Sequence, residues 1–109
     1  MAYDEGLARR LRDAMSAVPA TSEKKMFGGV ALLVGGNMCV GVIGEDLVAR
    51  VGPSAFPTAV GLPAARPFDF SGRPMTGWVM VGPGGVESDE ALGAWVERSL
   101  EFVRTLPPK

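Results

Sequence analysis

A short segment in the first third of the chain combines two cationic side chains with two glycines. In order, it reads Lys24, Lys25, Met26, Phe27, Gly28 and Gly29. Glycine N–H groups beside an ammonium group suit an anion such as a phosphate. Neither G-x-x-x-x-G-K-[ST] nor G-x-G-x-x-G occurs here, so the spacing is not that of a P-loop or a dinucleotide-binding turn. Two interpretations stay open: an anion or nucleotide site, or, as we favour, a glycine pair that bends a strand or allows a close approach.

Few other residues could carry out catalysis. The chain has no histidine, which removes the usual general base and the commonest zinc ligand. Its one cysteine, Cys39, lies in an apolar run where burial raises a thiol pKa, and we predict a core residue. The adjacent acids Glu45-Asp46 and Asp89-Glu90 lack the spacing of a calcium loop or of glycosidase carboxylates. We therefore predict no catalytic residue, no metal and no cofactor.

Arg50 is the more interesting charged residue. It falls on one face of a predicted strand at 47–51 whose other face is apolar. Our hypothesis is that Arg50 contributes to a ligand-binding or partner-binding face together with Lys25 and Arg73. The alternative, which we favour, is an ordinary exposed arginine at a solvated edge of the sheet.

Two long helices and one short helix are predicted to frame these residues. Residues 3–17 carry apolar side chains at helical spacing, and Pro19 ends that helix. Ser88, followed by two acids, is typical of the N-cap of a second long helix, which runs to about residue 106 with Trp95 on its apolar stripe. A short helix is predicted over residues 53–60, with Ser54 as a candidate cap.

The remaining apolar runs predict an antiparallel sheet of about five strands. The predicted strands are 30–34, 38–43, 47–51, 67–70 and 75–81. Gly35-Gly36-Asn37 predicts a tight turn between the first two, and Trp78 in the last strand is predicted to be core, like Trp95. The order α-β-β-β-α-β-β-α with short connections predicts an α+β, two-layer fold with flanking helices on one face of the sheet.

Size, charge and cysteine usage limit the class of protein. The 109 residues and 11.4 kDa fit one domain, predicted to span residues 1–109. The net charge of −1, without a basic segment, argues against direct nucleic-acid binding and against a membrane-surface patch. The uncharged run 26–44 is long enough to raise the question of a membrane span, but its glycine-rich turn favours two strands. One cysteine and no secretory-signal pattern predict a cytoplasmic protein.

Several motifs follow one another in an order that resembles a known family. After the Lys24–Gly29 segment they are Asn37-Met38, Asp46-Leu47 leading to Arg50, Arg66-Pro67-Phe68-Asp69-Phe70, Gly72-Arg73-Pro74-Met75, Gly77-Trp78-Val79, Trp95-Val96 and the ending Thr105-Leu106-Pro107-Pro108-Lys109. Over nearly the whole chain this series resembles the N-terminal domain of the TfoX/Sxy competence regulators. The resemblance implies a bacterial α+β domain similar to type III secretion chaperones, with no established catalytic residues.

The resemblance also implies a context. In proteobacterial members a helical C-terminal domain follows, and the two-domain protein promotes expression of DNA-uptake genes together with a cyclic-AMP-responsive activator. The 109 residues have about the length of the N-terminal domain alone, so we expect a stand-alone, single-domain member.

Three functions are carried forward as hypotheses. The first is a non-enzymatic regulatory or interaction domain that acts through protein contacts, for which six methionines offer an adaptable apolar surface. The chaperone-like fold implied by the resemblance adds a homodimer as a further hypothesis. The second is a small-molecule or nucleotide sensor that uses the Lys24–Gly29 segment. The third, direct DNA binding, is disfavoured by the near-zero net charge.

Overall fold

The computed structural model describes residues 3–26, 28–70 and 73–108, apart from the side chains of residues 70, 73 and 74. Its elements are α1 (Glu5–Ala14), β1 (Thr21–Met26), β2 (Gly29–Val34), β3 (Asn37–Ile43), β4 (Asp46–Arg50), α2 (Gly52–Ala59), β5 (Ala65–Phe70), β6 (Arg73–Val81), a short 3-10 turn (Pro83–Gly85) and α3 (Asp89–Val103). The predicted α+β fold is confirmed, with six strands where about five were predicted.

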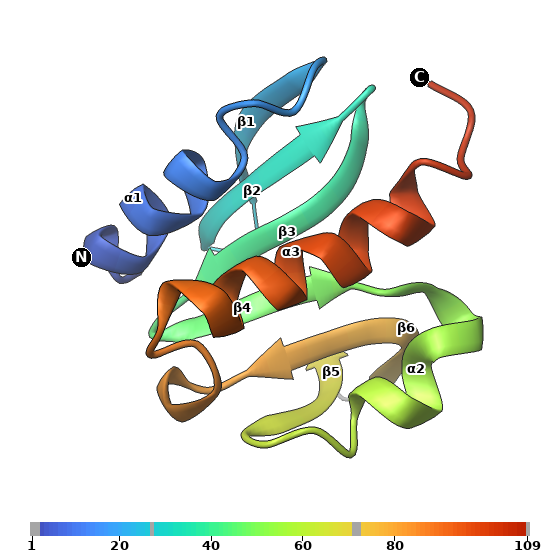
Figure 1. Ribbon diagram of the computed structural model, residues 1–109. Coiled ribbons are helices and arrows are strands. Elements are labelled where there is room, and N and C mark those ends of the chain that lie inside the picture. The colour runs from blue at the N-terminus through green and yellow to red at the C-terminus, as the bar shows by residue number, and fades with distance from the viewer. Residues whose placement is uncertain (1–2, 27, 71–72, 109) are drawn as a thin grey trace.

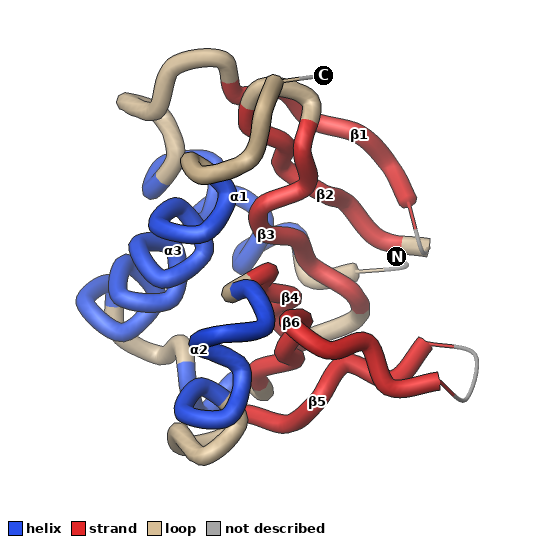
Figure 2. Tube along the Cα trace, turned by 90° about the vertical axis from the view of Figure 1, so that its right-hand side faces the viewer, coloured by secondary structure: helices blue, strands red, loops and turns tan. Residues whose placement is uncertain are grey.

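The strands form one antiparallel sheet in the order β1-β2-β3-β4-β6-β5. The helices lie on one side of this sheet (Figures 1 and 2), and α2 packs against β6 near its edge. Among the elements that the structure describes, no helix lies on the opposite side, as Figure 2 shows. We call this uncovered side the open face.

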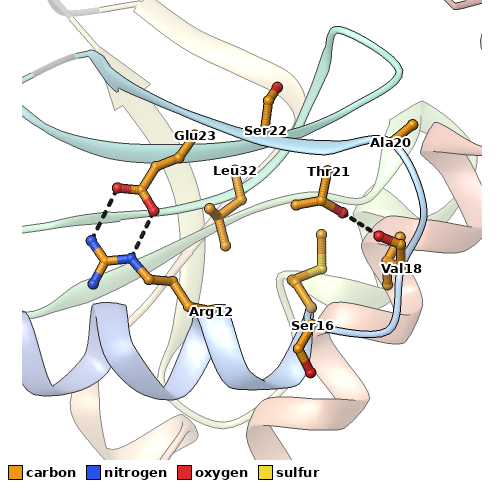
Figure 3. A pocket seen from close by; sticks show the side chains of 9 residues that line it. Arg12, Ser16, Val18, Ala20, Thr21, Ser22, Glu23 and Leu32 are labelled. Carbon is orange, nitrogen blue, oxygen red and sulfur yellow. Dashed lines mark hydrogen bonds and ion pairs between the residues drawn. The ribbon is translucent and has the colours of Figure 1, made fainter.

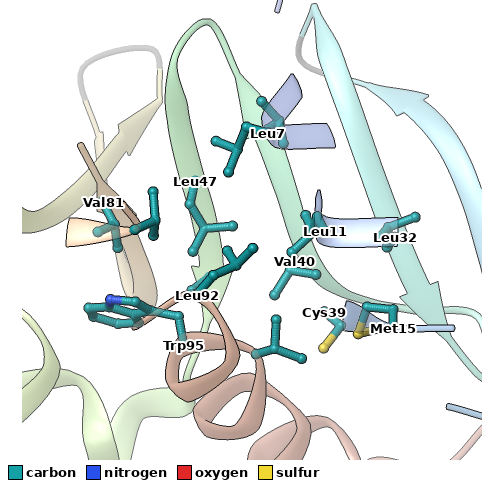
Figure 4. Close-up of a cluster of buried hydrophobic side chains, with 14 of the residues drawn as sticks. Leu7, Leu11, Met15, Leu32, Cys39, Val40, Leu47, Val81, Leu92 and Trp95 are labelled. Atoms are coloured by element: carbon teal, nitrogen blue, oxygen red, sulfur yellow. The ribbon is translucent and has the colours of Figure 1, made fainter. Parts of the chain in front are cut away.

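The main core lies between the helices and the sheet. Leu7, Leu11 and Met15 of α1 and Leu92 and Trp95 of α3 point toward the strands (Figure 4), and each is at most 5% exposed. Burying a side chain of this size contributes about 1.5–3 kcal/mol, so α1 and α3 are held mainly by this apolar contact. The strands contribute Val40, Leu47 and Val81, and the predicted core positions Cys39 and Trp95 are confirmed.

Local signals explain where the long helices begin and where the hairpin turns. The Ser88 hydroxyl accepts a hydrogen bond from the Ala91 N–H at 3.0 Å, as predicted for an N-cap. Gly35 and Gly36 have φ angles of 59° and 84°, which glycine adopts without strain, so the predicted turn between β2 and β3 is confirmed. The prediction for Ser54 is wrong, because α2 begins at Gly52 without a side-chain cap.

β1 is the strand that the sequence did not predict. It pairs with β2 along its whole length but lies at the edge of the sheet, so four of its six residues are exposed. An exposed edge strand needs no alternation of apolar side chains, and charged residues such as Lys24 and Lys25 discourage pairing with other chains.

Within the uncharged run 26–44, residues 29–43 form the β2–β3 hairpin, as predicted. In the described part of the chain, none of the helices has both the length and the apolar character needed to cross a membrane.

Candidate functional site

The open face carries a second apolar cluster, which contains no helical residue. Its buried members are Ala31, Met38, Val48 and Phe68, and its half-buried members are Met26, Leu33, Ile43, Met75, Trp78 and Met80. Four of these ten side chains are methionines, which adapt their shape more readily than branched side chains. The cluster is therefore an apolar surface, partly exposed, on the side of the sheet that no described helix covers.

The alternation of strand residues explains why both faces are apolar. In β4, Leu47 and Ala49 belong to the core under the helices, whereas Val48 belongs to the open-face cluster. Apolar residues on both sides are usual for strands that are covered on both faces. The sequence signal for a second apolar face is thus the uninterrupted apolar run Leu47-Val48-Ala49 of β4.

Trp78 belongs to this cluster and corrects a prediction. It was expected in the core, but it is half-buried and packs against the open-face cluster. The register explains the difference, because Val79 and Val81 point toward the helices and Trp78 and Met80 point away from them.

Arg50 lies at one end of the open face, where its guanidinium is placed between two aromatic rings. Its Cζ lies 5.0 Å from the ring centroid of Trp78 on β6 and 5.4 Å from that of Phe102 on α3. One guanidinium N–H donates a long hydrogen bond of 3.5 Å to the Met38 carbonyl oxygen. Burial lowers the pKa of Arg50, and none of the described carboxylates forms an ion pair with it. Arg50 is therefore a partly desolvated cation held by ring contacts.

The open face also carries the described charged side chains of Asp46, Arg66 and Lys24. Arg66 and Asp46 form an ion pair at 2.8 Å, and Arg66 also contacts the Met80 sulfur at 3.9 Å. Lys24 is exposed and lies opposite Ala31, so the register places it on this face. Since Asp46 is already paired, Lys24 and Arg50 are the uncompensated charges among these residues.

The described residues of the Lys24–Gly29 segment are Lys24, Lys25 and Met26 at the end of β1, Gly28, and Gly29 at the start of β2. Lys24 and Lys25 are exposed and alternate between the two faces, so their charges do not converge. Gly28 has a φ of +75°, and a Cβ atom at Gly29 would collide with the backbone of Val42 on β3. The predicted close approach at the glycine pair is thereby confirmed. Phe27 lies outside the described residues, and anion binding by this segment stays a prediction.

The structure does not bring Lys25 and Arg50 together. Lys25 lies opposite Val30, a residue of the core under the helices, whereas Arg50 lies opposite Trp78 of the open face. The two residues are also three strands apart in the sheet. Arg73 is the first residue of β6, and its side chain lies outside the described residues.

Cys39 on β3 is fully buried near Arg50. Burial raises the pKa of its thiol to about 12, although the positive charges of Arg104 and Arg50 oppose that shift. A neutral, inaccessible thiol is a poor nucleophile and a poor metal ligand. In the described part of the chain, no three His, Cys, Asp or Glu side chains are grouped as a metal site requires.

A separate cavity of about 360 Å³ lies between the end of α1 and β1. Met15 and Leu32 form its apolar wall, and the ion pair between Arg12 and Glu23, at 2.7 and 3.0 Å, closes one side (Figure 3). The hydrogen bonds from Arg12 lower the pKa of Glu23. Since both partners are 40% exposed, the ion pair contributes only a few tenths of a kcal/mol up to about 1 kcal/mol. Its clearest role is to attach the edge strand to α1.

Comparison with known proteins identifies the family. The sequence model of the TfoX N-terminal domain matches residues 13–103, which include every strand of the sheet and all of α3. Searches of curated proteins and of solved structures found no match. Because the matched region covers well over half of the 109 residues, this chain belongs to the TfoX N-terminal domain family.

Proposed function

We propose that this chain is a non-enzymatic regulatory domain that acts through protein contacts made by the open face. The observation that carries the proposal is the group of six half-buried apolar side chains on a sheet face without a described helix. Contiguous apolar surface of this kind commonly marks a contact site, because water is released when a partner covers it.

The chemistry of the chain supports a non-enzymatic role. The sequence has no histidine, and burial raises the pKa of its only thiol, Cys39, to about 12, so that thiol is neutral at neutral pH. A cysteine nucleophile activated by a neighbouring histidine is therefore not available. The methionines of the open face, in contrast, suit a surface that adjusts to the shape of a partner.

Affinity capture from cells of the native host, with matched surface variants, tests the proposal. Leu33→Glu and Ile43→Glu each place a carboxylate in the apolar open face, on β2 and β3 respectively. Ala94→Glu adds the same group to the exposed outer side of α3 and serves as the control. Circular dichroism of each purified variant checks that the fold is kept.

We expect the wild type and Ala94→Glu to capture the same proteins in equal amounts. Both open-face variants should capture at least tenfold less of these proteins, because burying an unpaired carboxylate in the contact is costly. Equal recovery of all partners by folded Leu33→Glu and Ile43→Glu would show that the open face is not the contact site.

A further inference from the structure

We propose that the open face recognises an apolar segment of a partner protein through an Asp or Glu side chain that pairs with Arg50. This inference rests on the proposed function and adds the chemistry of the partner. It concerns the end of the open face where β4, β6 and α3 meet.

The geometry around Arg50 prepares it for a carboxylate. The rings of Trp78 and Phe102, at 5.0 and 5.4 Å, restrict the guanidinium before any ligand arrives. A guanidinium has five N–H donors, and the structure gives one of them a weak bond to the Met38 carbonyl oxygen. The planar fork of N–H groups matches the two oxygens of a carboxylate, and a restrained arginine loses little side-chain entropy on binding.

Desolvation also favours an anionic partner. Burial lowers the pKa of Arg50, but the pKa of an arginine is so high that the side chain stays charged at neutral pH. None of the described carboxylates forms an ion pair with it. A cation that has already lost part of its water gains more from a carboxylate than a fully hydrated cation does.

The charges on the open face distinguish between occupants. A second copy docked face to face would add another Arg50 and another Lys24 to the same interface, while the Asp46 carboxylate of each copy is already held by Arg66. A nucleic acid would need several cations along a phosphate backbone, whereas the middle of this face is apolar. An apolar segment with an acidic side chain matches both the Met-rich centre and the cation at its end.

The test begins with a library of displayed random dodecapeptides selected on the wild-type chain of 109 residues. Enriched peptides are synthesised with amidated C-termini, so that only side chains carry carboxylates, and their binding is measured by fluorescence anisotropy. Arg98→Ala is the matched control, because the Arg98 Cζ lies 5.0 Å from the ring of Trp95 on the helical side of the molecule. Leu33→Glu reports whether a peptide uses the open face at all.

Some peptides will bind the wild type and not Leu33→Glu. We expect these peptides to contain Asp or Glu among apolar residues. For these peptides, Arg50→Ala should weaken binding by about tenfold or more, since hydrogen bonds to charged groups are the stronger kind, whereas Arg98→Ala should leave it unchanged. Replacing the peptide's acid by its amide should produce the same loss. Arg50→Lys should restore only part of the binding, because it keeps the charge but not the fork.

Other outcomes separate the two proposals. The proposed role of Arg50 would be wrong if open-face peptides lacked acidic residues, or if their binding were unchanged by Arg50→Ala and Arg50→Lys. Either result would not contradict the proposed interaction domain. If none of the selected peptides depended on Leu33, the proposed contact face itself would be wrong. Displacement of these peptides by a single-stranded oligonucleotide, in an Arg50-dependent manner, would assign the cation to a phosphate ligand instead.

Discussion

Arg50 and Cys39 lie near the same end of the sheet, where burial affects two kinds of titratable group. Burial lowers the pKa of the arginine and raises that of the thiol, because in each case it favours the neutral form. The outcome differs because the starting values differ. Arg50 keeps its charge at neutral pH and can attract an anion. At the same pH the Cys39 thiol is neutral and packs as an apolar core residue.

The Cys39 thiol predicts a pH dependence of stability. Its pKa is about 9 in the unfolded chain and about 12 in the folded one, so above pH 9 the unfolded chain gives up this proton more readily. Stability from this group is complete below pH 9 and falls as the pH rises toward 12, by at most about 1.4 kcal/mol per pH unit. Urea unfolding of the wild type and Cys39→Ala between pH 8 and pH 11 measures the difference. Parallel curves for the two proteins would contradict the assignment.

At the scale of elements, the backbones of β2 and β3 approach each other closely. Gly29 on β2 faces the backbone of Val42 on β3 so closely that a methyl group cannot be accommodated. Gly93 in α3, in contrast, has open space where a Cβ atom would lie. The two glycines therefore serve different purposes, since Gly29 allows two strands to approach and Gly93 leaves a gap on a helix surface.

These two glycines give opposite predictions for the same substitution. Gly29→Ala should lower the free energy of unfolding by about 2 kcal/mol or more, because the strands must move apart. Gly93→Ala should raise it by about 0.5–1 kcal/mol, because alanine is the better helix former. Thermal and urea unfolding of both variants tests the pair, and a stabilised Gly29→Ala variant would be inconsistent with the described packing.

At the scale of the whole molecule, the two faces of the sheet have different surroundings. One face is covered by α1 and α3 and forms the main core, and the other carries the open-face cluster with Arg50 at its end. The ion pair between Arg12 and Glu23 attaches edge strand β1 on the helical side. The described helices thus cover one face of the sheet, and the proposed contact with a partner would use the other face.

The homodimer suggested by the family resemblance remains a prediction, and the charges on the open face limit how it could form. Face-to-face pairing would bury Arg50 and Lys24 of both copies in one interface without a free Asp46 carboxylate to compensate them, so we expect any dimer to use another surface. Light scattering at high protein concentration should therefore give the same mass for the wild type and for Leu33→Glu. A wild-type dimer that Leu33→Glu converts to a monomer would place the dimer contact on the open face.

The sequence by itself determined the features that depend on neighbouring residues. The apolar stripe and the Ser88 cap specify α3, and Gly35-Gly36 specifies the β2–β3 turn because these glycines adopt positive φ. The apolar runs predicted five of the six strands and the buried position of Cys39, and the order of motifs indicated the family that the comparison confirmed. The signals for the individual elements are local, since each lies within one turn, one helix or one strand, whereas the family was indicated by motifs along nearly the whole chain.

The tertiary structure decided what depends on residues far apart in the chain. β1 exists because β2 pairs with it, although its own sequence lacks an apolar pattern. Trp78 is half-buried because its position in β6 places its side chain on the face that the described helices do not cover. Arg50 meets Phe102 only because α3 returns across the sheet, so two rings surround a cation that the sequence shows as an ordinary arginine. Long-range packing therefore created the candidate site, whereas local patterning supplied the strands that carry it.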